Sequence, residues 1–368
     1  MKIVADDKIP FIRGVFEPFA EVVYLKGAAI SRADVADADA LIVRTRTNCG
    51  AGLLRGSRVR FVATATIGYD HINASELAAL GIAWRNAPGC NAASVAQYLA
   101  AVLTGFGVPL AGRTLGVVGV GNVGKLAVKV GEALGMRVLL NDPPRAEAEG
   151  EAGFVPLDRI AAEADIVTLH VPKVAGGKHP TVGLLDEKFF ASARDGACLV
   201  NAARGEAVRG DALKAVLRSG KVAHAAIDVW ENEPDIDREL LDLCDFGTPH
   251  IAGYSTDGKA NGTTAAVRAV AEFLGIAELK SFRALPPPPA NAVEVAADEN
   301  APVERELHRI VCHTFDLHRT DGELRRDPGA FEQLRGSAPL RREPFAYRVA
   351  GGGAELRSKL GALGFQLV

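Results

Sequence analysis

The chain has 368 residues, and its formal net charge at neutral pH is −3. At about 150 residues per domain, this length predicts two or three compact units with clefts between them. The hydrophobic content of 48% and the charged content of 24% are ordinary for a soluble globular protein. The small net charge gives no electrostatic reason to expect a nucleic acid or an anionic membrane as a partner.

The cysteine pattern and the N-terminus indicate a cytoplasmic protein. The five cysteines have no CxxC spacing, so the sequence predicts neither a zinc cluster nor a disulfide framework. The N-terminus becomes acidic within six residues, which is unlike a secretory leader. The longest weakly polar stretch, residues 95–112, contains Gln97, Tyr98 and Pro109 and is too interrupted to span a bilayer. We therefore expect no membrane partner.

Short apolar runs that alternate with helical stretches predict two parallel sheets. Expected strands of the first unit are residues 2–5, 22–25, 40–43 and 61–64. A helix that begins near Asn91 leads into a second unit, whose expected strands are residues 114–120, 137–141, 166–170, 198–201 and 224–228. Alternation of strand and helix is typical of parallel sheets, so we expect α/β architecture with two doubly wound, Rossmann-like domains.

The second half of the chain predicts a discontinuous first domain and a third unit. Residues 262–273 have helical spacing and are expected to cross back and close the first sheet. The domains are then 1–93 with 253–281, 94–252, and a small α+β unit at 282–368. Residues 286–300 are expected to form a linker, followed by a helix from Val303 and strands at 345–349 and 364–368. About 70 residues make a marginal core, which a second subunit would complete.

A glycine motif directly after a predicted strand indicates a dinucleotide site. Gly119, Gly121 and Gly124 have G-x-G-x-x-G spacing at the start of a helical pattern. The first glycine permits a tight turn, the second lets a pyrophosphate approach the backbone, and the third lets helix and strand pack. Asp142 ends the next strand and is placed for ribose hydroxyls, which favours NAD, whereas Arg145 is the argument for NADP.

Three later segments supply a guanidinium, a carboxylate and an imidazole. They are Arg204 in a small-residue loop after a strand, Glu233 before a proline, and His250 after the apparent last strand. An arginine can hold a substrate carboxylate, an imidazole can accept a hydroxyl proton, and a carboxylate can stabilise the imidazolium. Their order after a cofactor turn predicts a 2-hydroxy acid dehydrogenase. No metal is required, because Arg204 supplies the positive charge. Each residue alone has a plain alternative as a solvated or packed side chain.

These segments resemble the D-isomer-specific 2-hydroxyacid dehydrogenase family over about residues 1–281. Within the family, the chain is similar to a branch that acts on a phosphorylated hydroxy acid. The likeness rests on residues 1–7, 38–44, 61–66, 87–92, 141–146, 247–254 and 258–264, and on residues 315–317 and 328–335 of the C-terminal unit. For that branch, the resemblance implies a homodimer formed through residues 282–368. A phosphorylated small-molecule hydroxy acid is then the expected substrate, oxidised by NAD.

Site residues follow from the same resemblance. It implies that Arg204, Glu233 and His250 are catalytic. The cofactor contacts that it adds to the glycines and Asp142 are Asn122, Val123, Val171, Ala202, Ala203, Arg204, Asp228 and Gly253. Substrate contacts are expected at Thr45, Thr66 and Tyr254, where Thr45 stands in place of a common serine and Val171 in place of a threonine. Arg44 and Arg46 are candidates for the substrate phosphate, with solvated arginines as the alternative.

Three other interpretations stay open at the level of sequence. A D-3-phosphoglycerate dehydrogenase is disfavoured because the C-terminal unit lacks an evident βαβ regulatory pattern. A non-catalytic NADH-sensing protein on the same fold is disfavoured by the near-neutral charge and the absence of a long disordered tail. In a third interpretation, the last 70 residues are a partner-binding module with a basic patch. This is disfavoured because their arginines are nearly balanced by acidic residues.

Overall fold

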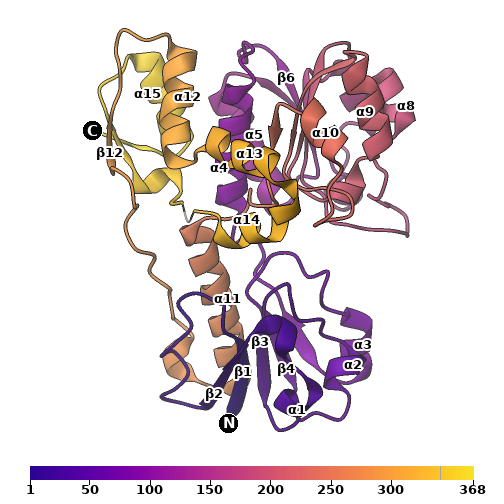
Figure 1. Cartoon of the computed structure of the whole chain (residues 1–368), viewed down its shortest axis with the longest axis vertical. Helices are drawn as coiled ribbons and strands as arrows, with labels where there is room; N and C mark the ends of the chain where they lie inside the picture. Colours follow the sequence, from indigo (N-terminus) through magenta and orange to yellow (C-terminus); the bar gives the residue numbers. More distant parts are fainter. Residues whose placement is uncertain (340) are drawn as a thin grey trace. The chain divides into compact units, whose positions relative to one another are not determined.

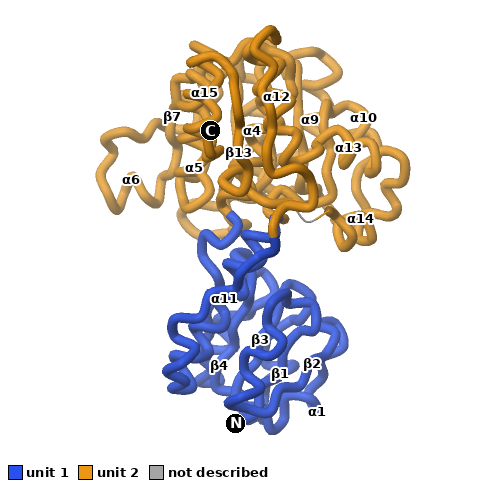
Figure 2. Tube along the Cα trace, turned by 90° about the vertical axis from the view of Figure 1, so that its left-hand side faces the viewer, with its two compact units in different colours: residues 1–91, 255–287 blue, residues 92–254, 288–368 orange. Residues whose placement is uncertain are grey.

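The computed structural model describes residues 1–339 and 341–368, which form two compact units. The first unit combines residues 1–91 with 255–287, and the second combines residues 92–254 with 288–368 (Figure 2). Each unit is thus built from two separated stretches of chain. The described residues include no helix that is both long enough and apolar enough to cross a membrane.

The first unit is a five-stranded parallel sheet with helices on its faces. Its strand order is β2-β1-β3-β4-β5, and Ile3 pairs with Val22 on one side and with Ala40 on the other. Its strands are β1 (Lys2–Asp6), β2 (Glu21–Leu25), β3 (Ala40–Val43), β4 (Phe61–Thr64) and β5 (Ala83–Arg85). Its helices are α1 (Arg32–Val35), α2 (Ala51–Leu54), α3 (Ala74–Ala79) and α11 (Thr256–Leu274).

Helix α11 completes the core of this unit although it is distant in sequence. Val267 and Val270 of α11 are fully buried against Ile3, Ala40 and Phe61 of the sheet. Strands β3 and β4 are buried at every position, which explains their uninterrupted apolar sequences. A helix returning from residue 256 therefore closes one face of a sheet formed by the first 85 residues.

The second unit contains a six-stranded parallel sheet of order β11-β10-β9-β8-β6-β7. Its strands are β6 (Thr114–Val118), β7 (Arg137–Asn141), β8 (Ile166–Leu169), β9 (Ala197–Asn201), β10 (Val222–Ile227) and β11 (Phe246–Gly247). The helices of this part are α4 (Ala92–Gly105), α5 (Asn122–Ala133), α6 (Pro143–Glu149), α7 (Leu157–Glu163), α8 (Glu187–Ser192), α9 (Gly210–Arg218) and α10 (Arg238–Leu243). Gly116 of β6 pairs with Leu139 of β7 on one side and with Val167 of β8 on the other. Successive strands are therefore added to opposite sides of β6, which makes β6 the point where the strand order reverses.

The C-terminal stretch belongs to the same compact unit as this sheet. It forms α12 (Val303–Thr314), α13 (Leu317–Arg326), α14 (Phe331–Ser337) and α15 (Ala354–Ala362), with strands β12 (Glu294–Ala296), β13 (Arg348–Ala350) and β14 (Gln366–Leu367). In Figure 1, α12 and α15 lie on the same side of the unit as β12. Leu307, Ile310 and Leu360 share one hydrophobic cluster with Leu99 and Val130 of α4 and α5. This segment therefore completes its core within the chain.

Both sheets and the small C-terminal sheet are parallel α/β structures, so the predicted fold class is confirmed. Three short strands were not predicted, namely β5, β11 and β12. Strand β12 lies in residues 286–300, so the prediction of a plain linker there was wrong. The C-terminal part contains a βαβ unit, formed by β13, α15 and β14 with parallel strands.

Candidate active site

The residues predicted for catalysis and cofactor binding lie where parallel strands of the six-stranded sheet end. They follow β6 (residues 119–124), β7 (Asp142), β8 (Val171), β9 (residues 202–204), β10 (Asp228) and β11 (residues 250–253), with Glu233 in the loop after β10. In open parallel sheets, ligands bind at this carboxyl edge, beside the point where the strand order reverses. The reversal here lies between β6 and β8, next to the glycine turn.

The glycine turn has the shape that a dinucleotide requires. Gly119 has a φ of 85°, and a Cβ at this position would lie 2.7 Å from the carbonyl oxygen of His170. A Cβ at Gly124 would overlap the carbonyl oxygen of Gly119, whereas a Cβ at Gly121 would meet no atom within 4 Å. Gly121 also precedes α5 and supplies no side-chain cap to the first amides of that helix. These features fit a bound pyrophosphate.

Asp142 and Arg145 bear on the choice between NAD and NADP. Asp142 accepts hydrogen bonds from the amides of Val120 (2.8 Å) and Arg145 (3.2 Å), which ties the acid to the cofactor turn. The Arg145 guanidinium donates to the carbonyl of Val120 (2.6 Å) and pairs with both carboxylate oxygens of Glu149. Because Glu149 neutralises Arg145, this arginine is poorly suited to a 2′-phosphate, which favours NAD.

His250 and Glu233 form a hydrogen-bonded pair. His250 Nδ1 lies 2.8 Å from Glu233 Oε2, and Glu233 Oε1 accepts the Trp230 amide at 2.8 Å. His250 has a φ of 55°, a conformation that is uncommon for a residue with a Cβ. Its amide donates to the carbonyl of Asp228 at 2.7 Å, which holds the residue in this conformation. The pair leaves Nε2 as the imidazole nitrogen available to a substrate.

Electrostatics favour an ionised Glu233 beside His250. Burial alone would raise the pKa of Glu233. The hydrogen bond and charge of His250, the Trp230 amide and the charge of Arg335 act in the opposite direction, and the resulting pKa is lowered from 4.5. A carboxylate that stays ionised can stabilise an imidazolium on its neighbour.

Asp228 supports the loop that carries His250. The side chain is 1% exposed, and its Oδ1 accepts from the Thr248 hydroxyl (2.6 Å) and the Ile251 amide (2.8 Å). Its Oδ2 accepts from the Ala252 amide at 2.9 Å. Burial raises the pKa of Asp228. These bonds hold the chain on both sides of His250, and a direct cofactor contact by Asp228 stays a prediction.

Arg341 holds the same loop from the other side, and the sequence did not indicate this role. It is 7% exposed, and its guanidinium donates to the carbonyls of Ile251 (3.2 Å) and Ala252 (2.6 Å). It also donates to Gln97 Oε1 (2.8 Å) on α4 and lies 4.1 Å from the Phe315 ring centroid. Arg341 is 89 residues or more from this loop in sequence, so no local pattern reveals the contact.

Arg204 lies in a loop that is fastened to the segment carrying Glu233. Arg204 follows β9, is partly buried, and donates to the carbonyl of Ala203 at 2.7 Å. A Cβ at the next residue, Gly205, would overlap the backbone of Trp230. Only glycine permits this approach. The loops of Arg204 and Glu233 are therefore in backbone contact.

The three predicted substrate residues are divided between the units. Thr45 and Thr66 follow β3 and β4 at the carboxyl edge of the first sheet, where the Thr66 hydroxyl donates to the carbonyl of Gly68 at 2.8 Å. Tyr254 lies in the second unit, four residues after His250, and the Cζ of Arg335 is 5.9 Å from its ring centroid. A shared substrate site for these residues stays a prediction.

Comparison with known proteins identifies the class. The NAD binding domain of D-isomer specific 2-hydroxyacid dehydrogenases matches residues 83–252, and a domain of unknown function matches residues 284–364. The chain belongs to the D-isomer specific 2-hydroxyacid dehydrogenase family and is an NAD-dependent dehydrogenase. NAD is its cofactor.

Named relatives cover nearly the whole chain. The erythronate-4-phosphate dehydrogenase of Bacteroides fragilis is 47% identical over 345 residues, which cover 92% of this chain and 96% of the relative. The enzyme of the same name from Escherichia coli O157:H7 is 41% identical over 343 residues, which cover 91% of this chain and 90% of the relative. The D-lactate dehydrogenase of Aquifex aeolicus, solved with NAD and lactic acid, shares the fold. The two structures superpose with a TM-score of 0.63 at 24% sequence identity. The match covers 78% of this chain and 100% of the D-lactate dehydrogenase chain.

Proposed function

We propose that this enzyme oxidises 4-phospho-D-erythronate to 2-oxo-3-hydroxy-4-phosphobutanoate in the pathway to pyridoxine 5′-phosphate. The observation that carries the proposal is the His250–Glu233 pair, with a separation of 2.8 Å, in the same sheet as a dinucleotide turn. Relatives named for this substrate at 41–47% identity support the choice of hydroxy acid. A cytoplasmic location is part of the proposal.

The proton is handled by His250. Because Glu233 Oε2 accepts from Nδ1, the neutral imidazole carries its proton on Nδ1 and presents the Nε2 lone pair to the C2 hydroxyl. As the C2–O bond becomes a carbonyl, Nε2 takes the hydroxyl proton, and the imidazolium is stabilised by the ionised Glu233. When bound, NAD⁺ supplies the acceptor for the hydride that leaves C2.

Arg204 is proposed to orient the substrate. A guanidinium binds a carboxylate through two parallel hydrogen bonds, and from this position it also polarises the neighbouring C2 oxygen. The contact of Gly205 with the Trp230 backbone ties the position of Arg204 to the loop of Glu233. Residues 119–124, Asp142, Val171, Ala202, Ala203, Asp228 and Gly253 are proposed to hold NAD.

Arg335 is the strongest candidate in the second unit for holding the substrate phosphate. Its Nε is buried, and no described residue accepts a hydrogen bond from it. Its Cζ lies 5.9 Å from the Tyr254 ring centroid, and its charge helps to lower the pKa of Glu233. A cation this close to the catalytic pair suits an anionic substrate. Arg44, which donates to the carbonyl of Lys8 at 3.0 Å, and Arg46 remain candidates in the first unit.

A substrate panel tests the proposed function. NADH formation is measured with 4-phospho-D-erythronate, D-3-phosphoglycerate and D-erythronate in parallel. The proposal predicts the highest kcat/KM for 4-phospho-D-erythronate. A preference for D-3-phosphoglycerate would replace the substrate. Tight NADH binding without turnover of any of the three would favour a non-catalytic NADH-sensing protein.

The phosphate assignment has its own test. In Arg335→Gln, kcat/KM for 4-phospho-D-erythronate should fall by about tenfold or more, since a charge-assisted contact is lost, while that for D-erythronate changes little. Arg319→Gln removes an exposed arginine of α13 and serves as the matched control. Equal losses for both substrates would contradict a phosphate contact, and a selective loss in Arg44→Gln would move the site to the first unit.

We also propose a homodimer formed through the C-terminal segment. Phe345 in this segment is 49% exposed, and a groove beside it is lined by Val311, Leu363 and Phe365. Light scattering on the full chain should give twice the mass of one chain, and Phe345→Asp should reduce it. A monomeric wild-type protein at micromolar concentration would overturn the proposal.

A further inference from the structure

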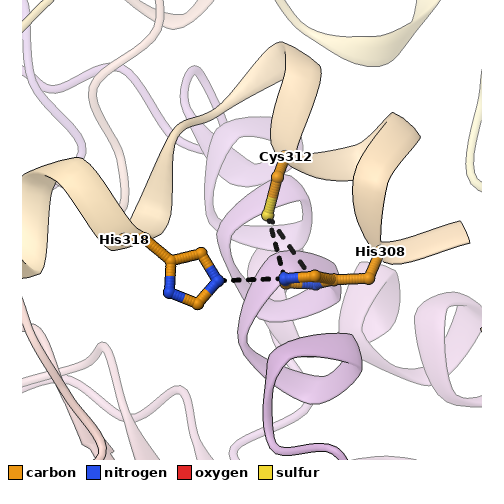
Figure 3. Close-up of side chains that lie close together, drawn as sticks. All are labelled: His308, Cys312 and His318. Carbon is orange, nitrogen blue, oxygen red and sulfur yellow. Dashed lines mark hydrogen bonds between the residues drawn. The ribbon is translucent and has the colours of Figure 1, made fainter. Parts of the chain in front are cut away.

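Three side chains that commonly bind transition metals converge outside the predicted active site. His308 and Cys312 lie one turn apart on α12, and His318 comes from the start of α13 (Figure 3). His308 Nε2 is 3.0 Å from His318 Nε2, and Cys312 Sγ is 3.6 Å from His308 Nε2. One ligand atom from each residue lies within 4.8 Å of the others.

We infer that His308, Cys312 and His318 form a binding site for Zn²⁺ or a similar divalent transition metal. Zn–N bonds of about 2.0–2.1 Å and a Zn–S bond of about 2.3 Å, in tetrahedral geometry, separate two nitrogens by about 3.3 Å and a nitrogen from a sulfur by about 3.6 Å. The distance from His308 Nε2 to Cys312 Sγ matches, the distance between the two Nε2 atoms is about 0.3 Å shorter, and the distance from His318 to Cys312 is within 4.8 Å. Imidazole and thiolate ligands together suit zinc rather than magnesium or calcium.

The surroundings orient His308 as a ligand. Its Nδ1 lies 3.0 Å from the Thr104 hydroxyl of α4, a contact that leaves Nε2 facing His318, and Cys312 Sγ lies 3.7 Å from Nδ1 and 3.6 Å from Nε2. A Cβ at Gly105 would come within 3.3 Å of His308 Cε1, so α4 also restricts the ring position. Hydrogen bonds from the second ring nitrogen are the usual way in which proteins orient metal-binding histidines.

The site is accessible to a metal ion from solvent. His318 is exposed, which gives a metal ion an entry path and leaves a fourth position for water. Metal binding would release the Cys312 thiol proton to solvent, because the thiolate is the form that binds a metal.

Metal at this site would connect α12 and α13 to the edge of the six-stranded sheet. The His318 ring packs against Phe246 of β11 with a centroid distance of 5.4 Å. Asp321 of α13 accepts the Gly247 amide of the same strand at 2.7 Å. Bound metal is therefore expected to stabilise the attachment of the C-terminal segment without taking part in the oxidation.

Titration of the purified, metal-free full chain with Co²⁺ and Zn²⁺ tests the inference. We expect one equivalent to bind, a near-ultraviolet thiolate-to-Co²⁺ absorption band, and a higher thermal unfolding temperature with Zn²⁺. Cys312→Ser should abolish the band, and Cys90→Ser, which alters another partly buried cysteine, should retain it. Thr104→Val keeps all three ligands and should weaken binding about 10- to 100-fold.

Two results would overturn the site. One is binding of less than one equivalent by the folded wild-type chain, with folding checked by NADH binding. The other is an unchanged affinity and thiolate band in Cys312→Ser. Since neither readout depends on turnover, failure of the metal site is distinguishable from failure of the proposed dehydrogenase activity.

Discussion

The cofactor turn and the loop of His250 lie at the same edge of one sheet but are held in different ways. Residues 119–124 depend mainly on their own glycines, since a Cβ at Gly124 would overlap the Gly119 carbonyl oxygen, and Asp142 also accepts the Val120 amide. The His250 loop is held by two side chains, Asp228 after β10 and Arg341 in the C-terminal segment. A short motif therefore accounts for most of the first region, whereas the second region also requires a contact from the C-terminal segment.

This difference has consequences for mutation. A change in the cofactor turn should act on NAD binding first, because the turn is built locally. A change that loosens the His250 loop should lower kcat and stability more than NAD binding, because Gly253 is the one proposed NAD contact in residues 250–253. The four predictions below use this distinction.

Arg341→Met is expected to have the largest effect on stability. It removes donors from the buried carbonyls of Ile251 and Ala252 and takes away a positive charge that interacts with the buried Asp228. Removing one member of such a buried charged network costs about 3–5 kcal/mol. Urea unfolding should show this loss, and kcat should fall more than the affinity for NADH. Arg341→Lys should restore part of both.

A merely structural role for Arg341 would give a different result. The variant would then be less stable, but its folded fraction at low temperature would keep the wild-type kcat. Arg342→Met, which changes the neighbouring and more exposed arginine, is the matched control.

Gly124→Ala and Gly121→Ala separate packing from cofactor approach. The Cβ added at Gly124 overlaps the Gly119 carbonyl oxygen, so this variant should lose about 1–3 kcal/mol of stability as well as NADH affinity. The Cβ added at Gly121 meets no protein atom, so only NADH affinity should fall. Unfolding and fluorescence titration measure the two effects. Unchanged NADH binding in Gly121→Ala would argue against a pyrophosphate at this turn.

Glu233→Gln tests the charge of the catalytic pair with a smaller effect, about 1 kcal/mol at neutral pH. The pKa of Glu233 is lowered from 4.5 in the folded protein, so its stabilising contribution is complete above that value and is lost as the pH falls through the folded-state pKa. The stability gap between wild type and variant should thus shrink as the pH falls below 4.5. A gap that keeps its full size well below pH 4.5 would contradict a Glu233 whose ionised form stabilises the fold.

Features encoded locally could be predicted from the sequence. The buried runs of β3 and β4 and the glycine turn after β6 are continuous patterns, and the structure has strands and turn at these places. Short strands were missed because they are too short to show a hydrophobic pattern in the sequence. Strand β11 has two residues, and β12 has three and follows a proline-rich stretch. Their positions depend on neighbouring strands that are distant in the chain.

The site shows the same division. Arg204, Glu233 and His250 were singled out by order and context, and the Glu233–His250 contact agrees with the roles expected of them. Arg341, Thr104 and His318 could not be singled out, because their significance arises only when α4, α12 and α13 pack together. The cysteine count also did not indicate the proposed metal site, since two of its three proposed ligands are histidines.

The most direct test of the account is NADH formation from 4-phospho-D-erythronate by wild type and His250→Asn, with NADH affinity measured on both. Loss of the proton acceptor should lower kcat by about 10²- to 10⁴-fold, while NADH affinity stays within about twofold because the cofactor turn is built separately. Undiminished turnover in the variant would contradict the role of His250. An equal loss of NADH binding would contradict the separation between the two regions.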